Sequence, residues 1–150
     1  EKKIICFCVG SSTELTAKQA GFLNTYSSEG SVDSLIELIV RTLDKKIGKL
    51  LYLSSEFISK PVGMEGSDFI NIVLRCSTNL EFIETNTLLK EIEAICGRER
   101  DPQNKFTPRT LDLDIICWNN FEGIIEGYKL PDPDIEKYDY IKVPLSEVKL

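Results

Sequence analysis

The sequence predicts an α+β domain with a ferredoxin-like βαββαβ core, in which helices pack on a mainly antiparallel sheet. Three observations support this prediction. Four apolar segments have the length and composition of strands, and two segments between them have the apolar periodicity of amphipathic helices. The two kinds follow one another as strand, helix, strand, strand, helix, strand. At 150 residues, the chain is expected to form one domain, 1–150, with a single sizeable core.

The first half of the chain is expected to supply the first strand, helix and strand. A near-continuous apolar run over 3–9 is typical of a buried strand, and Gly10-Ser11-Ser12 is expected to end it in a turn. A short helix is expected over 15–23. A longer helix should end at Gly48, and a second strand should follow over 50–58. The apolar stripe of the longer helix consists of Leu35, Ile36, Ile39, Val40 and Leu43.

The second half is expected to supply the remaining strand, helix and strand. A loop over 59–67 precedes a third strand over 68–76, and Thr78-x-x-Glu81 resembles the capping box of a helix that runs to Cys96. A polar loop over 98–107 leads to the last strand. After this strand we expect a turn at Asn119-Asn120, a short edge strand at 124–125 and then an irregular tail. In the third strand, the inward side chains are expected to be Ile70, Ile72, Leu74 and Cys76, with Phe69, Asn71, Val73 and Arg75 on the opposite face.

Composition and charge exclude several classes of function. Hydrophobic residues make up 42% of the chain and charged residues 28%, which is ordinary for a globular protein. The net charge of −6 disfavours a nucleic-acid binder, which would carry a basic patch. The chain has no apolar run of membrane-spanning length and no signal-peptide pattern, so neither a membrane protein nor a secreted protein is expected.

Histidine and cysteine usage narrow the chemistry further. The chain has no histidine, which excludes a histidine general base, a Ser-His-Asp triad and any zinc site that needs imidazole. Its five cysteines are odd in number and lack the paired spacing of zinc ribbons, so buried, reduced thiols are expected, and a cytoplasmic location fits them. Cys6-x-Cys8, as half of a soft metal site, is the weaker alternative.

The segment 108–118 carries the strongest chemical signal. If it is a strand, Leu111, Leu113, Ile115 and Cys117 share one face, and Asp112 and Asp114 share the other, roughly 6.6 Å apart along the strand. Adjacent carboxylates repel each other, and a divalent cation such as Mg²⁺ relieves that repulsion. A strand with one solvated face is the alternative. Arg109 and Thr110 favour the metal site, because a guanidinium beside a metal suits a phosphate.

The same segment carries a family resemblance. Pro108 to Ile115, Pro-Arg-Thr-Leu-Asp-Leu-Asp-Ile, resembles the signature of the 6-hydroxymethyl-7,8-dihydropterin pyrophosphokinase family. The resemblance implies that Asp112 and Asp114 hold two Mg²⁺ ions that bridge the ATP phosphates. The other residues implied on the ATP side are Arg98 as a catalytic loop arginine, Arg100 as a second loop cation, Arg109 and Thr110 at the phosphates, and Glu93 in the ATP-binding wall. For Glu93, an exposed helix acid is the alternative.

The resemblance also implies a pterin site. The family holds the pterin ring between two aromatic side chains, to which Phe69 and Tyr140 correspond, with Asn71 as the amide partner. Ser59 and Val62 belong to a segment similar to the family loop that offers backbone groups to the pterin. Without the motif, Phe69 and Tyr140 would be interpreted as core aromatics.

Three positions depart from the family pattern. Ser12 replaces an asparagine, Asp132 replaces a histidine that contacts ATP, and Tyr138 replaces an arginine. The changes at Asp132 and Tyr138 remove positive charge from the ATP side. Lys129 or Lys137 is expected to compensate for the lost positive charge.

The resemblance implies an enzyme that transfers diphosphate from ATP to 6-hydroxymethyl-7,8-dihydropterin and releases AMP. Positioning and charge neutralisation carry such a reaction, so no histidine is required. The expected partners are ATP and a reduced pterin, with no nucleic acid and no membrane, and a monomer is compatible with the sequence. Two alternatives remain: a catalytically weakened or inactive pterin-binding relative, and another Asp-x-Asp metal-dependent nucleotidyltransferase.

Overall fold

The computed structural model describes residues 3–12, 32–60, 68–95 and 111–148, and for residues 3–12, 32–35, 38 and 95 it describes the backbone alone. The helix expected over 15–23 lies outside the described residues. The elements are β1 Lys3–Ser12, α2 Val32–Lys46, β2 Lys49–Leu53, β3 Phe57–Ser59, β4 Phe69–Thr78, α3 Phe82–Ile95, β5 Leu111–Trp118, β6 Gly123–Ile125, β7 Tyr128–Leu130, the short 3-10 helix η2 Pro133–Ile135 and α4 Asp139–Glu147.

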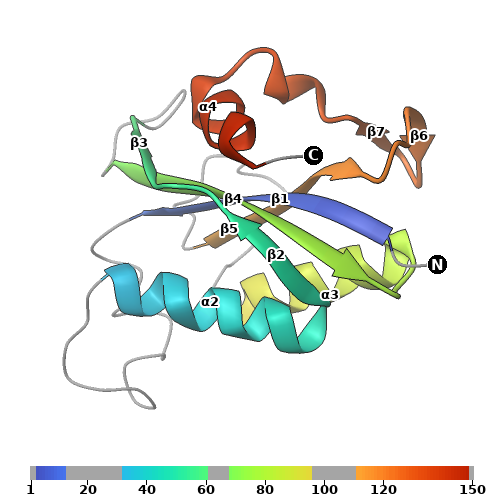
Figure 1. The fold of residues 1–150 in the computed structure, drawn as a ribbon, viewed down its shortest axis with the longest axis horizontal. Coiled ribbons are helices and arrows are strands. Elements are labelled where there is room, and N and C mark those ends of the chain that lie inside the picture. Colours follow the sequence, from blue (N-terminus) through green and yellow to red (C-terminus); the bar gives the residue numbers. More distant parts are fainter. Residues whose placement is uncertain (1–2, 13–31, 61–67, 96–110, 149–150) are drawn as a thin grey trace, which may run out of the picture.

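The central sheet has the strand order β2-β4-β1-β5, with β3 also paired to β4, and each of these pairs is antiparallel. Helices α2 and α3 lie on one face of this sheet and α4 lies on the other (Figure 1). The predicted α+β class with helices on an antiparallel sheet is therefore confirmed. None of the described helices is long and apolar enough to cross a membrane.

The main core lies between the sheet and the pair α2 and α3. Helix α2 turns the described part of its predicted apolar stripe inward, because residues three and four apart share one helix face. From α2 the buried residues include Ile39 and Leu43, with Ile36 and Val40 packed against them. Their partners on α3 and the sheet include Leu89, Ile92, Ile72, Leu74, Cys76, Leu111 and Leu113.

The opposite face of the sheet holds a second, smaller core under α4. Val73 of β4 and Ile116 of β5 pack there against Ile141 and Val148, and all four are buried. The expectation of an irregular tail is therefore wrong, since its last part forms α4 and covers this face. The sequence does not indicate this helix clearly, because α4 has only nine residues. It also contains Pro144, and a proline inside a segment normally indicates the end of a helix.

The boundaries of the first two predicted strands differ from the prediction. Strand β1 continues through Ser12 instead of turning at Gly10, because this end pairs with both β4 and β5. The strand expected over 50–58 is split into β2 and β3. At the break, Ser54 replaces the regular ladder, since its N–H donates to the Val73 carbonyl and its hydroxyl accepts the Val73 N–H, each at 2.9 Å.

The start of α3 lies later than the predicted capping box. The Glu81 N–H donates to the Glu84 carboxylate at 2.8 Å, so the box-like bond begins at Glu81 and not at Thr78. The Thr78 hydroxyl instead accepts the Leu80 N–H at 3.1 Å and stabilises the turn before the helix.

Gly48 joins α2 to β2, as expected for a glycine after a helix. Its φ is +156°, and a Cβ at this position would overlap the Ser77 carbonyl oxygen of β4. Only glycine allows this close approach of the two backbones.

Strand β5 contains a bulge at Ile116. Its neighbours Ile115 and Cys117 pair with consecutive residues of β1, so Ile116 is the extra residue. The bulge resets the alternation, and Trp118 joins the main core in place of Cys117. The expectation that Cys117 shares the face of Leu111 is therefore wrong. In the described part of the chain, Cys76 is a buried thiol and Cys117 a half-buried one, which agrees with the predicted reduced cysteines.

Candidate active site

Asn71 and Asp112 lie in one row across three strands. Gly10 of β1 is paired with Asn71 of β4 on one side and with Asp112 of β5 on the other. Directly paired residues point to the same face of a sheet, so both side chains rise from the face that α4 covers further along. Because Gly10 has no side chain, nothing from β1 rises between them.

The next row on this face leads toward α4. Cys8 of β1 is paired with Val73 and with Asp114, which places Asp114 one row closer to α4 than Asp112. Val73 belongs to the buried cluster under α4, whereas the Asp114 side chain is 54% exposed. The two aspartates therefore stand beside the region that α4 closes, and they remain accessible.

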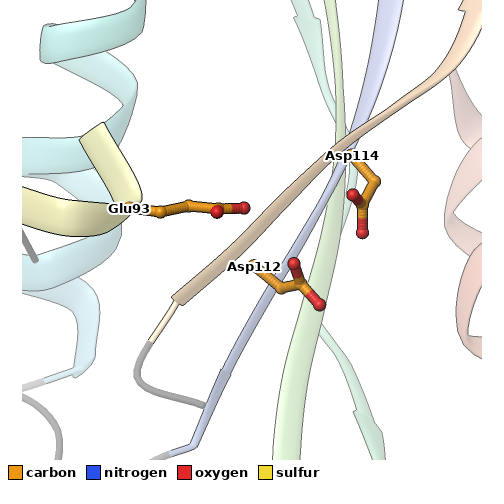
Figure 2. Close-up of side chains that lie close together, drawn as sticks. All are labelled: Glu93, Asp112 and Asp114. Atoms are coloured by element: carbon orange, nitrogen blue, oxygen red, sulfur yellow. The ribbon is translucent and has the colours of Figure 1, made fainter. Parts of the chain in front are cut away.

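Asp112, Asp114 and Glu93 form a carboxylate cluster. One oxygen from each side chain lies within 4.8 Å of the others. Figure 2 shows both aspartates projecting from β5, and Glu93 reaching toward that strand from α3. The predicted pairing of Asp112 and Asp114 on one strand face is confirmed, and helix α3 adds a third carboxylate to the pair.

Glu93 is fully buried, so its alternative interpretation as an exposed helix acid is wrong. Its Oε1 atom accepts the Leu113 N–H at 2.8 Å and a proton of the Lys90 ammonium at 2.9 Å. A buried carboxylate needs such partners because burial without them is costly. Glu93 therefore fixes the strand segment between the two aspartates.

Lys90 is a residue that the sequence reasoning missed. Its Nζ atom donates to Glu93 Oε1, to the Leu113 carbonyl at 3.0 Å and to Asp114 Oδ1 at 3.3 Å. The available signal was its position three residues before Glu93, which places both side chains on one face of α3. That spacing is common on exposed helix faces, so it did not indicate a site by itself.

Within the carboxylate cluster, the pKa of Asp114 is clearly shifted. Its pKa is raised above the ordinary aspartate value, first because the carboxyl is partly desolvated and second because Asp112 is negatively charged. Lys90 opposes both effects, and Glu93 adds to them. Binding of a further cation nearby would therefore stabilise the ionised form of Asp114.

The donor set suits a hard divalent cation. The oxygens come from two accessible carboxylates on one strand and a buried third on the neighbouring helix. Mg²⁺ prefers carboxylate oxygens, and it takes only one or two of them when phosphates and water complete its shell. Since Glu93 already accepts the Leu113 N–H, Asp112 and Asp114 are the residues that fit the metal.

The structure brings together three of the residues expected at the pterin. The Asn71 side chain is buried, and its amide nitrogen donates to the Phe57 carbonyl at 3.1 Å and to Ser59 Oγ at 2.9 Å. Ser59 is in turn paired with Phe69, which is half-buried at the start of β4. These bonds turn the amide nitrogen toward β3, which fixes the orientation of the Asn71 amide.

Tyr140, the other expected aromatic, lies at the start of α4. Its ring stacks on the ring of Tyr138, with centroids 5.0 Å apart and an interplanar angle of 18°. Tyr140 also packs against the cluster under α4, which includes Val73. Tyr138, a departure from the family pattern, thus supports an aromatic residue of the expected site.

Asp132, another departure, has a local structural role. Its carboxylate accepts the Asp134 N–H at 2.8 Å and caps η2. Lys137 pairs with Asp134 at 2.7 Å, and Lys129 is exposed on β7. The remaining expected site residues, Val62, Arg98, Arg100, Arg109 and Thr110, lie outside the described residues, as does the loop over 98–107.

Comparison with known proteins gives one consistent family. The family model described as 7,8-dihydro-6-hydroxymethylpterin-pyrophosphokinase matches residues 22–150. The 2-amino-4-hydroxy-6-hydroxymethyldihydropteridine pyrophosphokinase of Aquifex aeolicus is 29% identical over 122 residues, which are 79% of this chain and 75% of that protein. The protein of the same name from Porphyromonas gingivalis is 26% identical over 130 residues, 85% of this chain and 88% of its own length.

A longer relative is the bifunctional protein FolKE of Lactococcus lactis subsp. lactis. It is 29% identical over 132 residues, which are 87% of this chain. The match spans only 37% of that protein.

Proposed function

The chain belongs to the 7,8-dihydro-6-hydroxymethylpterin-pyrophosphokinase family, and we propose that it transfers diphosphate from ATP to 6-hydroxymethyl-7,8-dihydropterin with Mg²⁺ as cofactor. Membership makes it an ATP-dependent pyrophosphokinase of folate biosynthesis. The products of the proposed reaction are AMP and the pterin diphosphate. We further expect a single domain that acts as a monomer in the cytoplasm, with ATP and a reduced pterin as its partners.

The row formed by Asn71, Gly10 and Asp112 is the observation that carries this proposal. Neighbouring strands are about 4.8 Å apart, so the backbones of Asn71 and Asp112 are separated by roughly 10 Å. A pterin held at Asn71 would lie over Gly10, with its hydroxymethyl arm directed toward the aspartates. The row therefore places an amide that can bind the pterin ring near carboxylates that can hold the metal at the phosphates.

On the pterin side, the chain's own residues would bind and orient the ring. Asn71 is already held in one orientation by Phe57 and Ser59, so it need not be ordered when the pterin binds. Phe69 and Tyr140 would supply the two stacking surfaces. Val62 would contribute backbone contacts from its loop.

On the phosphate side, Asp112 and Asp114 would hold the metal. Bound there, Mg²⁺ supplies charge neutralisation at the phosphates and lowers the pKa of the attacking alcohol. We assign two such ions to the site, with the carboxylates and the ATP oxygens as their ligands. Glu93 would keep Asp112 and Asp114 in place through its bond to the strand between them.

The cationic residues expected at the phosphates complete the proposal. Arg98 and Arg109 would stabilise charge on the transferred group, and Arg100, Thr110 and Lys129 would bind ATP. The loop over 98–107 would exclude water once both substrates are bound. This chemistry depends on positioning and charge, so it needs no side chain as general base.

The direct test is to incubate the protein with ATP, Mg²⁺ and 6-hydroxymethyl-7,8-dihydropterin and to quantify AMP, ADP and the pterin product. An Asp112→Asn/Asp114→Asn double variant serves as the metal-site knockout, and Glu122→Gln, at an exposed acid directly before β6, serves as its control. Pterin-dependent AMP that disappears only in the double variant is the expected result.

Other outcomes would identify the alternatives. Pterin binding without AMP would indicate an inactive pterin-binding relative. Nucleotide joined to the acceptor would indicate a nucleotidyltransferase that uses the same aspartates. ADP in place of AMP would mean that a single phosphoryl group is transferred.

A further inference from the structure

We propose that Lys90 weakens the binding of bare divalent cations at Asp112 and Asp114, so that the site retains metal chiefly together with nucleotide phosphates. This inference rests on the proposed function, because it concerns the loading of the same metal site. It assigns a role to a residue that neither the family motif nor the family comparison singled out.

The first step is the fixed position of the ammonium group. Lys90 Nζ donates to oxygens of three residues, Glu93, Leu113 and Asp114, at 2.9, 3.0 and 3.3 Å. Its side chain is 25% exposed. Three acceptors match the three protons of an ammonium, so the charge is held beside the carboxylates.

The second step is the balance of charge. Glu93, Asp112 and Asp114 together carry three negative charges when ionised, and Lys90 contributes one positive charge in direct contact with two of them. Counted over these described residues alone, the cluster has a net charge of −2 with Lys90 and would have −3 without it. An entering divalent cation meets both a weaker attraction and an ammonium of its own sign close to Asp114.

Lys90 affects a bound nucleotide in the opposite way. Phosphate oxygens are negatively charged, so the same ammonium that repels a bare cation attracts the phosphates of a metal–nucleotide complex. Lys90 thus lowers the affinity for the bare cation and raises the affinity for the metal–nucleotide complex. The consequence is a site that discriminates against free metal and in favour of metal that is already bound to ATP.

The test measures metal binding without any turnover. Mn²⁺ replaces Mg²⁺ as the probe, and its affinity for the nucleotide-free protein is measured by calorimetry and by electron paramagnetic resonance. Lys90→Met removes the charge at nearly constant side-chain length, and Lys90→Arg retains the charge. Lys142→Met is the matched control, since that exposed lysine on α4 pairs with Glu136 at 3.5 Å.

We expect Lys90→Met to bind Mn²⁺ about three- to tenfold more tightly than the wild type, the range for one partly screened charge. Lys90→Arg and Lys142→Met should stay near the wild-type value. The Mn²⁺ complex of a non-hydrolysable ATP analogue should bind Lys90→Met more weakly. This pattern of tighter bare metal and weaker metal–nucleotide cannot come from a general loss of structure, which would weaken both.

Equal or weaker Mn²⁺ binding by Lys90→Met would overturn the inference, and Lys90→Gln repeats the measurement if the methionine variant does not fold. The proposed metal site itself is checked with the Asp112→Asn/Asp114→Asn protein. Wild-type Mn²⁺ binding that this double variant abolishes supports the metal site, even if Lys90→Met then leaves the affinity unchanged. Absence of site-specific binding in both the wild type and Lys90→Met would overturn both proposals.

Discussion

The buried Glu93 carboxylate accepts the backbone N–H of Leu113, the residue between the two aspartates, at 2.8 Å. Lys90 of the same helix donates to the Leu113 carbonyl at 3.0 Å. Both outward polar groups of one strand residue are therefore held by side chains of α3. The position of Asp112 and Asp114 thus depends on helix α3 as well as on the sheet.

Removing this carboxylate should destabilise the protein. Glu93→Ala leaves the buried Leu113 N–H without its acceptor and Lys90 without its closest counter-charge, so we expect a loss of about 2–3 kcal/mol in the free energy of unfolding. Glu93→Gln should cost less, because its amide oxygen can still accept the Leu113 N–H. Urea unfolding of the three proteins measures this order, and equal stability of Glu93→Ala and wild type would contradict it.

A side chain at Gly10 should obstruct the row between Asn71 and Asp112. Gly10→Val suits a strand but fills the space over which we place the pterin, so pterin affinity should fall about ten- to a hundredfold. Nucleotide affinity should change much less. Calorimetric titration with each ligand separates the two effects, and Gly10→Ala should give an intermediate loss. Unchanged pterin affinity in the valine variant would place the ring elsewhere.

The raised pKa of Asp114 predicts a pH-dependent gain of stability in Asp114→Asn. A carboxyl whose pKa is higher in the folded than in the unfolded state lowers stability while it is ionised, and this cost disappears as the pH falls through the folded-state pKa. The metal-free asparagine variant should therefore be more stable than wild type at pH 7, with a smaller difference in acid.

Urea unfolding in a chelating buffer at several pH values measures this difference. Glu122→Gln is again the control, and its difference from wild type should not show the same trend. A difference for Asp114→Asn that is independent of pH would show that the carboxylate is not strained by its surroundings.

The buried thiol of Cys76 should make the protein less stable at alkaline pH. Burial, helped by the negative charge of Asp44, raises the pKa of its thiol from 9.0 to about 12. The unfolded thiol loses its proton above pH 9 while the folded thiol keeps it, so the stabilising effect of Cys76 should be lost as pH rises from 9 toward 12. The stability advantage of wild type over Cys76→Ala, about 1 kcal/mol at neutral pH, should shrink across that range in urea unfolding. A constant advantage would contradict the predicted burial of the thiol.

Periodicity predicted the parts of the fold in which one face of an element is buried. The stripe containing Ile39 and Leu43 was readable because helix geometry repeats every three to four residues. The alternation of Leu111 and Leu113 with Asp112 was readable in the same way, and it carried the candidate metal site with it. These predictions needed no information about distant partners.

The features that the sequence did not predict depend on contacts between segments that are far apart in the chain. The bulge at Ile116 arises from pairing with β1, and α4 is stabilised by the second core, so neither has a strong local pattern. The sequence pattern of Glu93 and Lys90 is likewise that of ordinary helix residues, and their role follows only from their bonds to Leu113 of strand β5. Sequence reasoning therefore found the two aspartates and missed the lysine that contacts one of them.

The bonds at Leu113 also affect the outer edge of the sheet at strand β5. Among the described strands, β5 is the last in the order of the sheet, and an outer strand with unoccupied backbone groups can recruit a strand from another molecule. Glu93 and Lys90 occupy the Leu113 N–H and carbonyl, and they place charge along that border. The side chains that hold Leu113 beside the proposed metal site would therefore also hinder the pairing of an additional strand at this residue.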